Sequence, residues 1–187
     1  MTPSGPVCDS GALGAPAQLS GLSHLAASPA AAPNQMTLLV FSGDYDKLMA
    51  ALMVATGAAA SGQKVSIFFS FWGVLALKRQ TRYSGKNWIA RLMTACLPSG
   101  PARLPTSRLN FFGAGPRMFG ALMKQRNIPA LPELLTVARE LDVKLIVCPM
   151  SMEMLGIARE ELIEGLEVAG VASFVACSSL SQTTLVF

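Results

Sequence analysis

The chain has few side chains that can act as nucleophiles or bind a metal. Its 187 residues include one histidine, His24, and four cysteines that are far apart: Cys8, Cys96, Cys148 and Cys177. No C-x-x-C pair occurs, which argues against both a dense disulfide framework and a zinc site. Because His24 lies in a segment that we expect to be unfolded, a Cys–His dyad and a histidine-bound metal are also disfavoured. We expect no metal and no cofactor.

Cys148 is the cysteine best placed for chemistry. It ends an apolar run at 144–148, and Ser151 is the expected cap of a helix that follows. Reactive groups of open α/β sheets gather at the carboxyl ends of the strands, and N–H groups at a helix N-terminus favour a thiolate. A thiolate can attack a sulfur donor and hold the sulfur as a persulfide without a metal. A buried structural cysteine is the alternative, and position alone leaves both open.

The elements that would position Cys148 alternate along the chain. The sequence predicts strands at 37–41, 65–70, 144–148, 171–176 and 183–187, and helices at 46–60, 87–95, 116–126, 131–141 and 151–165, with a loop at 97–110. Asp44 is the expected N-cap of the first helix, Gly62 its stop, and Pro132 suits a first helical turn. The pattern is typical of an α/β domain with an open, mostly parallel sheet of about five strands and helices on both faces.

Residues 1–35 differ in composition from the rest. They are rich in Ala, Pro, Gly and Ser and contain no Lys or Arg. The segment has neither the basic start of a signal peptide nor the Arg-rich character of a transit peptide. We interpret 1–35 as a disordered extension and 36–187 as one folded domain.

The chain is apolar enough to raise the question of a membrane span, with 51% hydrophobic and 14% charged residues. The two most apolar stretches, 48–62 and 65–77, are each shorter than the roughly 20 residues that cross a bilayer. They fit a buried helix and a buried strand better than a membrane span. The localisation that we expect is cytoplasmic.

Charge is unevenly distributed. Ten of the fifteen basic residues and no acidic residue lie between Lys78 and Arg126, whereas eight of the eleven acidic residues lie between Glu133 and Glu167. Two solvated faces of opposite sign would explain this, and so would a basic docking surface for an acidic protein or an anionic membrane. Nucleic acid is disfavoured because no binding motif accompanies the charge.

Several motifs together resemble the DsrE/DsrF/DrsH-like family of small sulfur-trafficking proteins. They occur in order through most of 36–187 and include V-F-S-G-D-Y-D-K at 40–47, F-F-S-F-W-G at 68–73, L-P-E-L at 131–134, C-P-M-S-M at 148–152 and M-L-G-I at 154–157. Residues 1–35 lie outside the resemblance, and Cys96 and Cys177 match no family position.

The resemblance implies a DsrE-like, three-layer fold and a sulfur carrier or sulfurtransferase-like protein. The family's sulfur-carrying cysteine falls on Cys148. The resemblance also implies that rhodanese-type proteins donate the sulfur, that TusA-like proteins accept it, and that the chain assembles into a homo-oligomer. The donor, the acceptor and the direction of transfer do not follow from the sequence.

Three further motifs could contribute to the site. Phe71-Trp72-Gly73 should reach the same sheet edge as Cys148, either to shield it or simply to pack. Met118, Met123, Met150, Met152 and Met154 could surround a persulfide, but ordinary core packing is the preferred interpretation. The strand-to-helix turn Ser42-Gly43-Asp44 resembles a phosphate-binding loop only faintly, because it has one glycine and an acidic residue that would repel phosphate. We therefore reject nucleotide binding.

Two alternative functions remain. One is a non-catalytic membrane-surface or assembly subunit, peripherally associated through the basic segment and 48–77, with Cys148 structural. The other is a thiol peroxidase, disfavoured because no Arg or Thr stands beside Cys148. If Cys148 and Cys177 ended neighbouring strands, Cys177 could attack the persulfide and leave an internal disulfide.

Overall fold

The structure is a computed structural model that describes residues 34–81, 98, 100–101, 104–107 and 114–187. Most of the expected extension at 1–35, the expected helix at 87–95 and much of the loop at 97–110 lie outside the described residues. Cys8, His24 and Cys96 lie outside them too.

One open sheet organises the described residues. Its five strands lie in the order β4-β3-β2-β1-β5, and every pairing is parallel. The strands are β1 (Gln35–Val40), β2 (Lys64–Phe69), β3 (Lys144–Val147), β4 (Glu167–Val168) and β5 (Thr183–Val186). The predicted α/β class, with a parallel sheet of about five strands, is confirmed.

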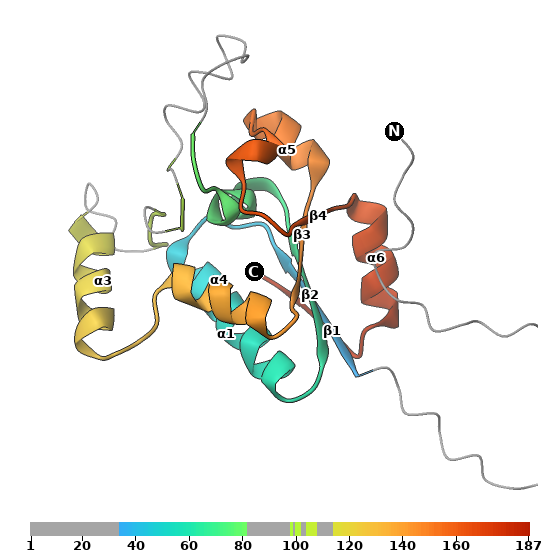
Figure 1. The fold of residues 1–187 in the computed structure, drawn as a ribbon, viewed down its shortest axis with the longest axis horizontal. Coiled ribbons are helices and arrows are strands. Elements are labelled where there is room, and N and C mark those ends of the chain that lie inside the picture. The colour runs from blue at the N-terminus through green and yellow to red at the C-terminus, as the bar shows by residue number, and fades with distance from the viewer. Residues whose placement is uncertain (1–33, 82–97, 99, 102–103, 108–113) are drawn as a thin grey trace, which may run out of the picture.

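Helices lie on both faces of the sheet (Figure 1). α1 (Tyr45–Ala60) and α4 (Leu131–Glu140) pack side by side over one face, whereas α6 (Val171–Leu180) packs against β1 on the other. α3 (Ala114–Gln125) stands apart from them, close to the predicted range 116–126. Three short elements complete the described chain: η1 (Phe71–Leu77), α5 (Pro149–Leu155) and η4 (Arg159–Glu161).

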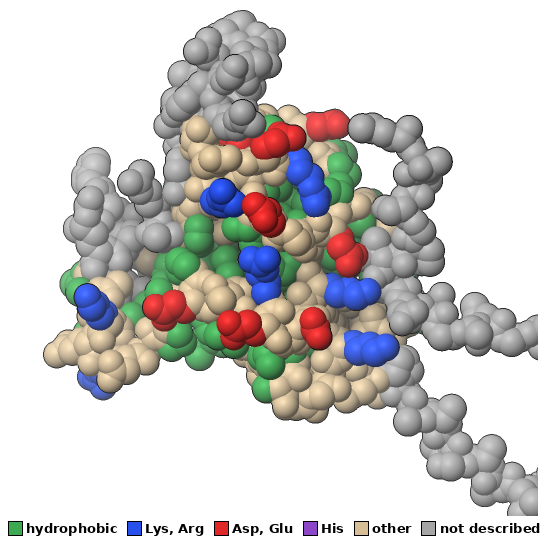
Figure 2. Space-filling model, in the orientation of Figure 1, with side chains coloured by type: hydrophobic (Ala, Val, Ile, Leu, Met, Phe, Trp, Pro, Cys, Tyr) green, Lys and Arg blue, Asp and Glu red, His purple; other side chains and the backbone are tan. Residues whose placement is uncertain are grey.

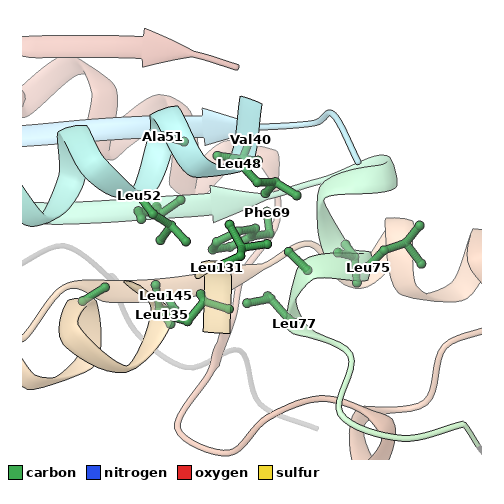
Figure 3. Packing of buried hydrophobic residues seen from close by; sticks show 14 of the residues in the cluster. Val40, Leu48, Ala51, Leu52, Phe69, Leu75, Leu77, Leu131, Leu135 and Leu145 are labelled. Carbon is green, nitrogen blue, oxygen red and sulfur yellow. The ribbon is translucent and has the colours of Figure 1, made fainter. Parts of the chain in front are cut away.

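Alternation along the central strands explains the layers. Leu38 of β1, Ile67 of β2 and Leu145 of β3 lie in register and are buried in the larger core beneath α1 and α4. Phe68 and Ile146, one position further along, face the smaller cluster under α6. Figure 3 shows side chains from β1, β2, α1 and α4 interdigitating in the larger core. The apolar stretches at 48–62 and 65–77 therefore supply core-facing elements.

The start and stop signals of two helices are confirmed. Asp44 is the N-cap of α1, although its side chain makes no capping hydrogen bond. Gly62 follows α1 with φ +82°, a left-handed conformation that favours glycine. Pro132 lies in the first turn of α4.

Four local predictions are wrong. Residues 171–176 are the start of α6 and not a strand, because an apolar run bounded by small residues fits either element and here packs as a helix. The helix predicted at 151–165 begins at Pro149 and ends where Gly156 takes a left-handed φ of 64°. Ser151 lies inside this helix, whose N-cap is Cys148. Residues 71–77, the second half of the stretch at 65–77 that the sequence favours as a buried strand, form the 3-10 helix η1. In addition, the sequence does not predict β4.

The uneven charge of the sequence is partly neutralised by folding. Lys78 is fully buried with its Nζ 3.7 Å from Glu161 Oε2, and exposed Arg79 donates to Glu164 at 3.1 Å. On the face in Figure 2, Lys and Arg side chains are interspersed with Asp and Glu. At least these two residues of the basic segment therefore pair with the acidic segment. Among the described residues, no helix has both the length and the apolar character that crossing a bilayer requires.

Candidate functional site

Cys148 sits at the carboxyl edge of the sheet, between a strand and a helix. Its N–H donates to the carbonyl of Phe69 at 3.0 Å, which continues the β2–β3 ladder by one residue. Its carbonyl accepts from the N–H of Met152 at 3.2 Å in the first turn of α5. Pro149 suits this first turn because it has no N–H to satisfy. Backbone contacts on both sides therefore fix Cys148, whose partly buried thiol is not in a disulfide.

An apolar cavity of about 330 Å³ lies beside Cys148. Its walls come from the ends of β1, β2, β3 and β4 and from the first turns of α6. The lining residues are Leu39, Phe41, Phe68, Phe69, Ser70, Phe71, Cys148, Ala169, Gly170, Val171, Phe174 and Val175. Apart from Cys148, Ser70 supplies the one polar side chain among the described residues of this lining. The thiol thus borders a space bounded by hydrocarbon and aromatic rings.

Ser151 holds the wall that Phe71 forms. Its hydroxyl accepts the N–H of Phe71 at 2.9 Å and lies 3.1 Å from the hydroxyl of Ser70. Phe71 has φ +43°, an uncommon conformation for a non-glycine residue. Ser151 itself is 2% exposed, and its two partly buried hydrogen bonds tie the end of β2 to α5.

Gly73 allows η1 to approach the end of β1. A Cβ atom at this position would lie 2.3 Å from the carbonyl oxygen of Val40, so no larger residue fits without a backbone shift. Trp72 packs over Gly43, whose ideal Cβ would lie 3.1 Å from the Cβ of Trp72. The predicted approach of Phe71-Trp72-Gly73 to the edge of Cys148 is confirmed. Phe71 lines the cavity, whereas Trp72 and Gly73 pack against the neighbouring loop and strand.

The five methionines do not form the pocket considered from sequence. None of them lines the cavity. Met123 and Met152 are buried in the larger core, in line with the preferred packing role, whereas Met118, Met150 and Met154 are exposed.

The turn at Ser42 to Asp44 satisfies its own polar groups. Ser42 donates its hydroxyl to Asp44 at 2.9 Å, and Lys47 lies 2.7 Å from the same carboxylate. This carboxylate, held in the turn, would repel a phosphate.

The strand-neighbour geometry expected for Cys177 is wrong. Cys177 lies in α6 and is buried with Phe68, Ile146 and Ala169. It does not line the cavity beside Cys148. The predicted attack of Cys177 on a Cys148 persulfide loses its geometric basis, which required two neighbouring parallel strands.

Two other expected features can be compared with the described residues. The described residues that line the cavity beside Cys148 include neither Arg nor Thr, the residues that a thiol peroxidase would use to activate a peroxide. Among the described part of the chain, no three His, Cys, Asp or Glu residues are grouped so that they could hold a metal.

Sequence comparison identifies the family. Residues 32–186 match the DsrE/DsrF/DrsH-like family. The chain belongs to this family. Protein YrkE of Bacillus subtilis is 40% identical over 141 residues, which cover 75% of this chain and 88% of YrkE. Sulfur carrier protein DsrE2 of Allochromatium vinosum is 26% identical over 151 residues, covering 75% of this chain and 89% of DsrE2.

Solved structures also resemble the chain at low sequence identity. YchN of E. coli covers 82% of this chain and 99% of its own, with 12% identity and a TM-score of 0.47. The predicted membership of the DsrE/DsrF/DrsH-like family is confirmed by the match of residues 32–186.

Sequence reasoning found Cys148 but missed most of the cavity. Phe68 and Phe71 belong to a motif that was recognised, but their role as walls follows only from the sheet edge. Phe174 and Val175 do not follow from the sequence, because its pattern predicts a strand at 171–176 where the structure has α6. Ala169 directly follows β4, which the sequence does not predict. The length of the segment from Gly170 to Ser181, with Gly170 at the N-cap, is the local signal that favours a helix.

Proposed function

We propose that this DsrE-like protein is a sulfur carrier that holds sulfane sulfur as a persulfide on Cys148. The observation that carries the proposal is the position of this free cysteine at the carboxyl edge, beside an apolar cavity. The kinship to DsrE2, a named sulfur carrier, supports it.

The chemistry needs few groups besides the thiol. The thiolate attacks a sulfane sulfur, an S–S bond of the donor breaks, and the donor leaves with the bonding electrons. An acceptor thiolate later attacks the outer sulfur and regenerates Cys148. The apolar walls lie beside the stored sulfur, and the backbone contacts of Cys148 to Phe69 and Met152 hold its position. This transfer makes the protein sulfurtransferase-like.

The proposal includes protein partners. Rhodanese-type proteins would donate the sulfur and TusA-like proteins would accept it, in the cytoplasm, with the chain acting as a homo-oligomer. Exposed apolar side chains around the site support an interaction surface there. They include Phe41, Phe71, Trp72, Met150, Val171 and Val175.

Mass spectrometry of the intact protein tests the proposal. After incubation with thiosulfate and a rhodanese, the protein should gain sulfur that dithiothreitol removes. Cys148→Ser should abolish the gain, whereas the matched Cys96→Ser variant should retain it. If Cys148→Ser loads as well as the parent, the proposal is wrong.

A further inference from the structure

The cavity beside Cys148 is larger than a persulfide needs. One sulfur atom attached to the thiol would occupy a small part of the roughly 330 Å³. Pockets for small molecules in proteins start at about 300 Å³. The space therefore suits a group of several heavy atoms next to the reactive sulfur.

The lining indicates which kind of group fits. Within the described parts of the chain, the lining has twelve residues, which include five phenylalanines and no charged side chain. The hydroxyl of Ser70, the one polar group besides the thiol, already pairs with Ser151. A sulfonate placed here would lose its hydration without a compensating charge or donor. The walls therefore favour a weakly hydrated, polarisable group, and divalent sulfur packs well on aromatic rings.

We propose that the cavity holds a chain of several sulfane sulfur atoms attached to Cys148, so that the protein carries a polysulfide. This inference rests on the proposed function of Cys148 and names its donor class as inorganic polysulfide. Thiosulfonate-forming donors would be poorer, because a sulfonate is strongly hydrated through all its oxygens. A polysulfide chain has uncharged internal sulfur atoms, and its single charged terminal sulfur can lie at the exposed rim beside Val171 and Val175.

The loading step balances with polysulfide alone. The Cys148 thiolate donates an electron pair to an internal sulfur of the donor, and a new S–S bond forms as one S–S bond of the donor breaks. The shorter fragment leaves with the electron pair of the broken bond and takes up a proton from water. The chain bound to Cys148 keeps the donor's other terminal sulfur with its negative charge. The cysteine sulfur is oxidised and the leaving sulfur is reduced by the same amount, so no further oxidant is required.

Two substitutions alter the cavity without removing the thiol. Gly170 lines the cavity, and a Cβ atom built there meets no atom within 4 Å, so Gly170→Leu can fill space without a backbone clash. Val175 lines the cavity and is 55% exposed, so Val175→Glu adds a charge at its rim. Leu180→Glu is the matched control, because Leu180 is an exposed residue of the same helix outside the lining.

The experiment uses the full chain. The parent and the three variants, checked for folding by circular dichroism, are treated with inorganic polysulfide without oxygen, alkylated and digested, and the masses of the Cys148 peptide are recorded. The parent should carry two or more extra sulfur atoms on Cys148. Gly170→Leu should lower the ratio of longer chains to single persulfide about tenfold, as expected from loss of two methylene-sized buried groups. Val175→Glu should also lower it, and Leu180→Glu should not.

The outcomes separate this inference from the proposed function. If the parent carries one sulfur atom at any polysulfide excess, the polysulfide inference is wrong and the persulfide carrier stands. Unchanged chain lengths in both cavity variants would overturn the inference in the same way. If Cys148 gains no sulfur at all, the proposed function fails first.

Discussion

The two edges of the sheet have different chemistry. At the carboxyl edge, the ends of β1, β2, β3 and β4 and the first turns of α6 line the apolar cavity of about 330 Å³ beside Cys148. At the amino edge, a cavity of about 270 Å³ is lined mostly by polar and charged residues: Gln35, Gln63, Lys64, Val65, Ser66, Leu141, Asp142 and Lys144. The volumes are similar, so the lining and the nucleophile distinguish the edges.

The loops that leave each edge account for the difference. At the amino edge, exposed turns at Gly62 and Asp142 return the chain from α1 and α4 to the sheet. At the carboxyl edge, Gly73 and Ser151 draw η1 and α5 tightly against the strand ends. Close packing at one edge builds an apolar site, whereas open turns at the other leave charges in water. Substitutions at the two edges should therefore have unequal effects on the stability of the fold and on the loading of sulfur onto Cys148.

The largest effect on stability is expected from the ion pair that ties η1 to η4 near the carboxyl edge. Lys78→Met leaves the carboxylate of Glu161 buried without this ammonium group, which should cost about 3–5 kcal/mol. The melting temperature should fall by roughly 10 °C or more. Thermal unfolding measures this, and Arg79→Met, which removes the exposed pair with Glu164, is the control with little effect. Equal shifts in both variants would contradict the account.

Glycine substitutions compare the two edges directly. Gly73→Ala places a Cβ atom 2.3 Å from the Val40 oxygen and should cost about 3 kcal/mol while disturbing sulfur loading. Gly62→Ala meets no atom within 4 Å and only strains φ +82°, so it should cost about 1–2 kcal/mol and leave loading intact. Chemical denaturation and loading assays of both variants test this. A larger loss for Gly62→Ala would reverse the comparison.

A smaller loss is expected at Ser151. Ser151→Ala removes the acceptor of the Phe71 N–H, which should cost about 1–2 kcal/mol. Since Phe71 forms a wall of the cavity, sulfur on Cys148 should also be lost faster to cyanide. Ser179→Ala, which removes an exposed hydroxyl bonded to Val175 on α6, should change neither quantity. Equal cyanide reactivity in the two variants would argue against a shielding role.

The smallest effect is a pH dependence at the start of α1. Burial alone would raise the pKa of Asp46, but hydrogen bonds from Ser107 and the charge of Lys47 outweigh it, so the pKa lies below its usual value. The folded state is therefore stabilised above the unfolded pKa of about 3.9, and this contribution is lost as pH falls through the lower folded pKa. Asp46→Asn should reduce the acid sensitivity of the melting temperature by about 1 °C. An unchanged or greater sensitivity would contradict this.

Much of the sheet and its first helices could be predicted from local sequence. The predicted strand at 144–148 corresponds to β3 at Lys144–Val147, and the predicted helix at 46–60 to α1 at Tyr45–Ala60. These elements have apolar runs bounded by strong signals such as Gly62. Cys148 could be placed at a strand end because it is the last residue of the apolar run at 144–148.

The rest of the site depends on contacts that are distant in sequence. β4 has two residues, and it exists through pairing with β3. The conformation of Phe71 depends on Ser151, eighty residues later. α6 is apolar on most sides, so its periodicity does not distinguish a helix from a strand. The cavity walls could not be assigned without the fold.

The most direct test of the account labels the sulfur and locates it. The protein is loaded with polysulfide enriched in a heavy sulfur isotope, alkylated without reductant and digested, and every cysteine peptide is examined by mass spectrometry. The account predicts that dithiothreitol-sensitive heavy sulfur is found on the Cys148 peptide and that blocking Cys148 beforehand with iodoacetamide prevents uptake. Heavy sulfur on other cysteines, with an unmodified Cys148, would contradict the central claim.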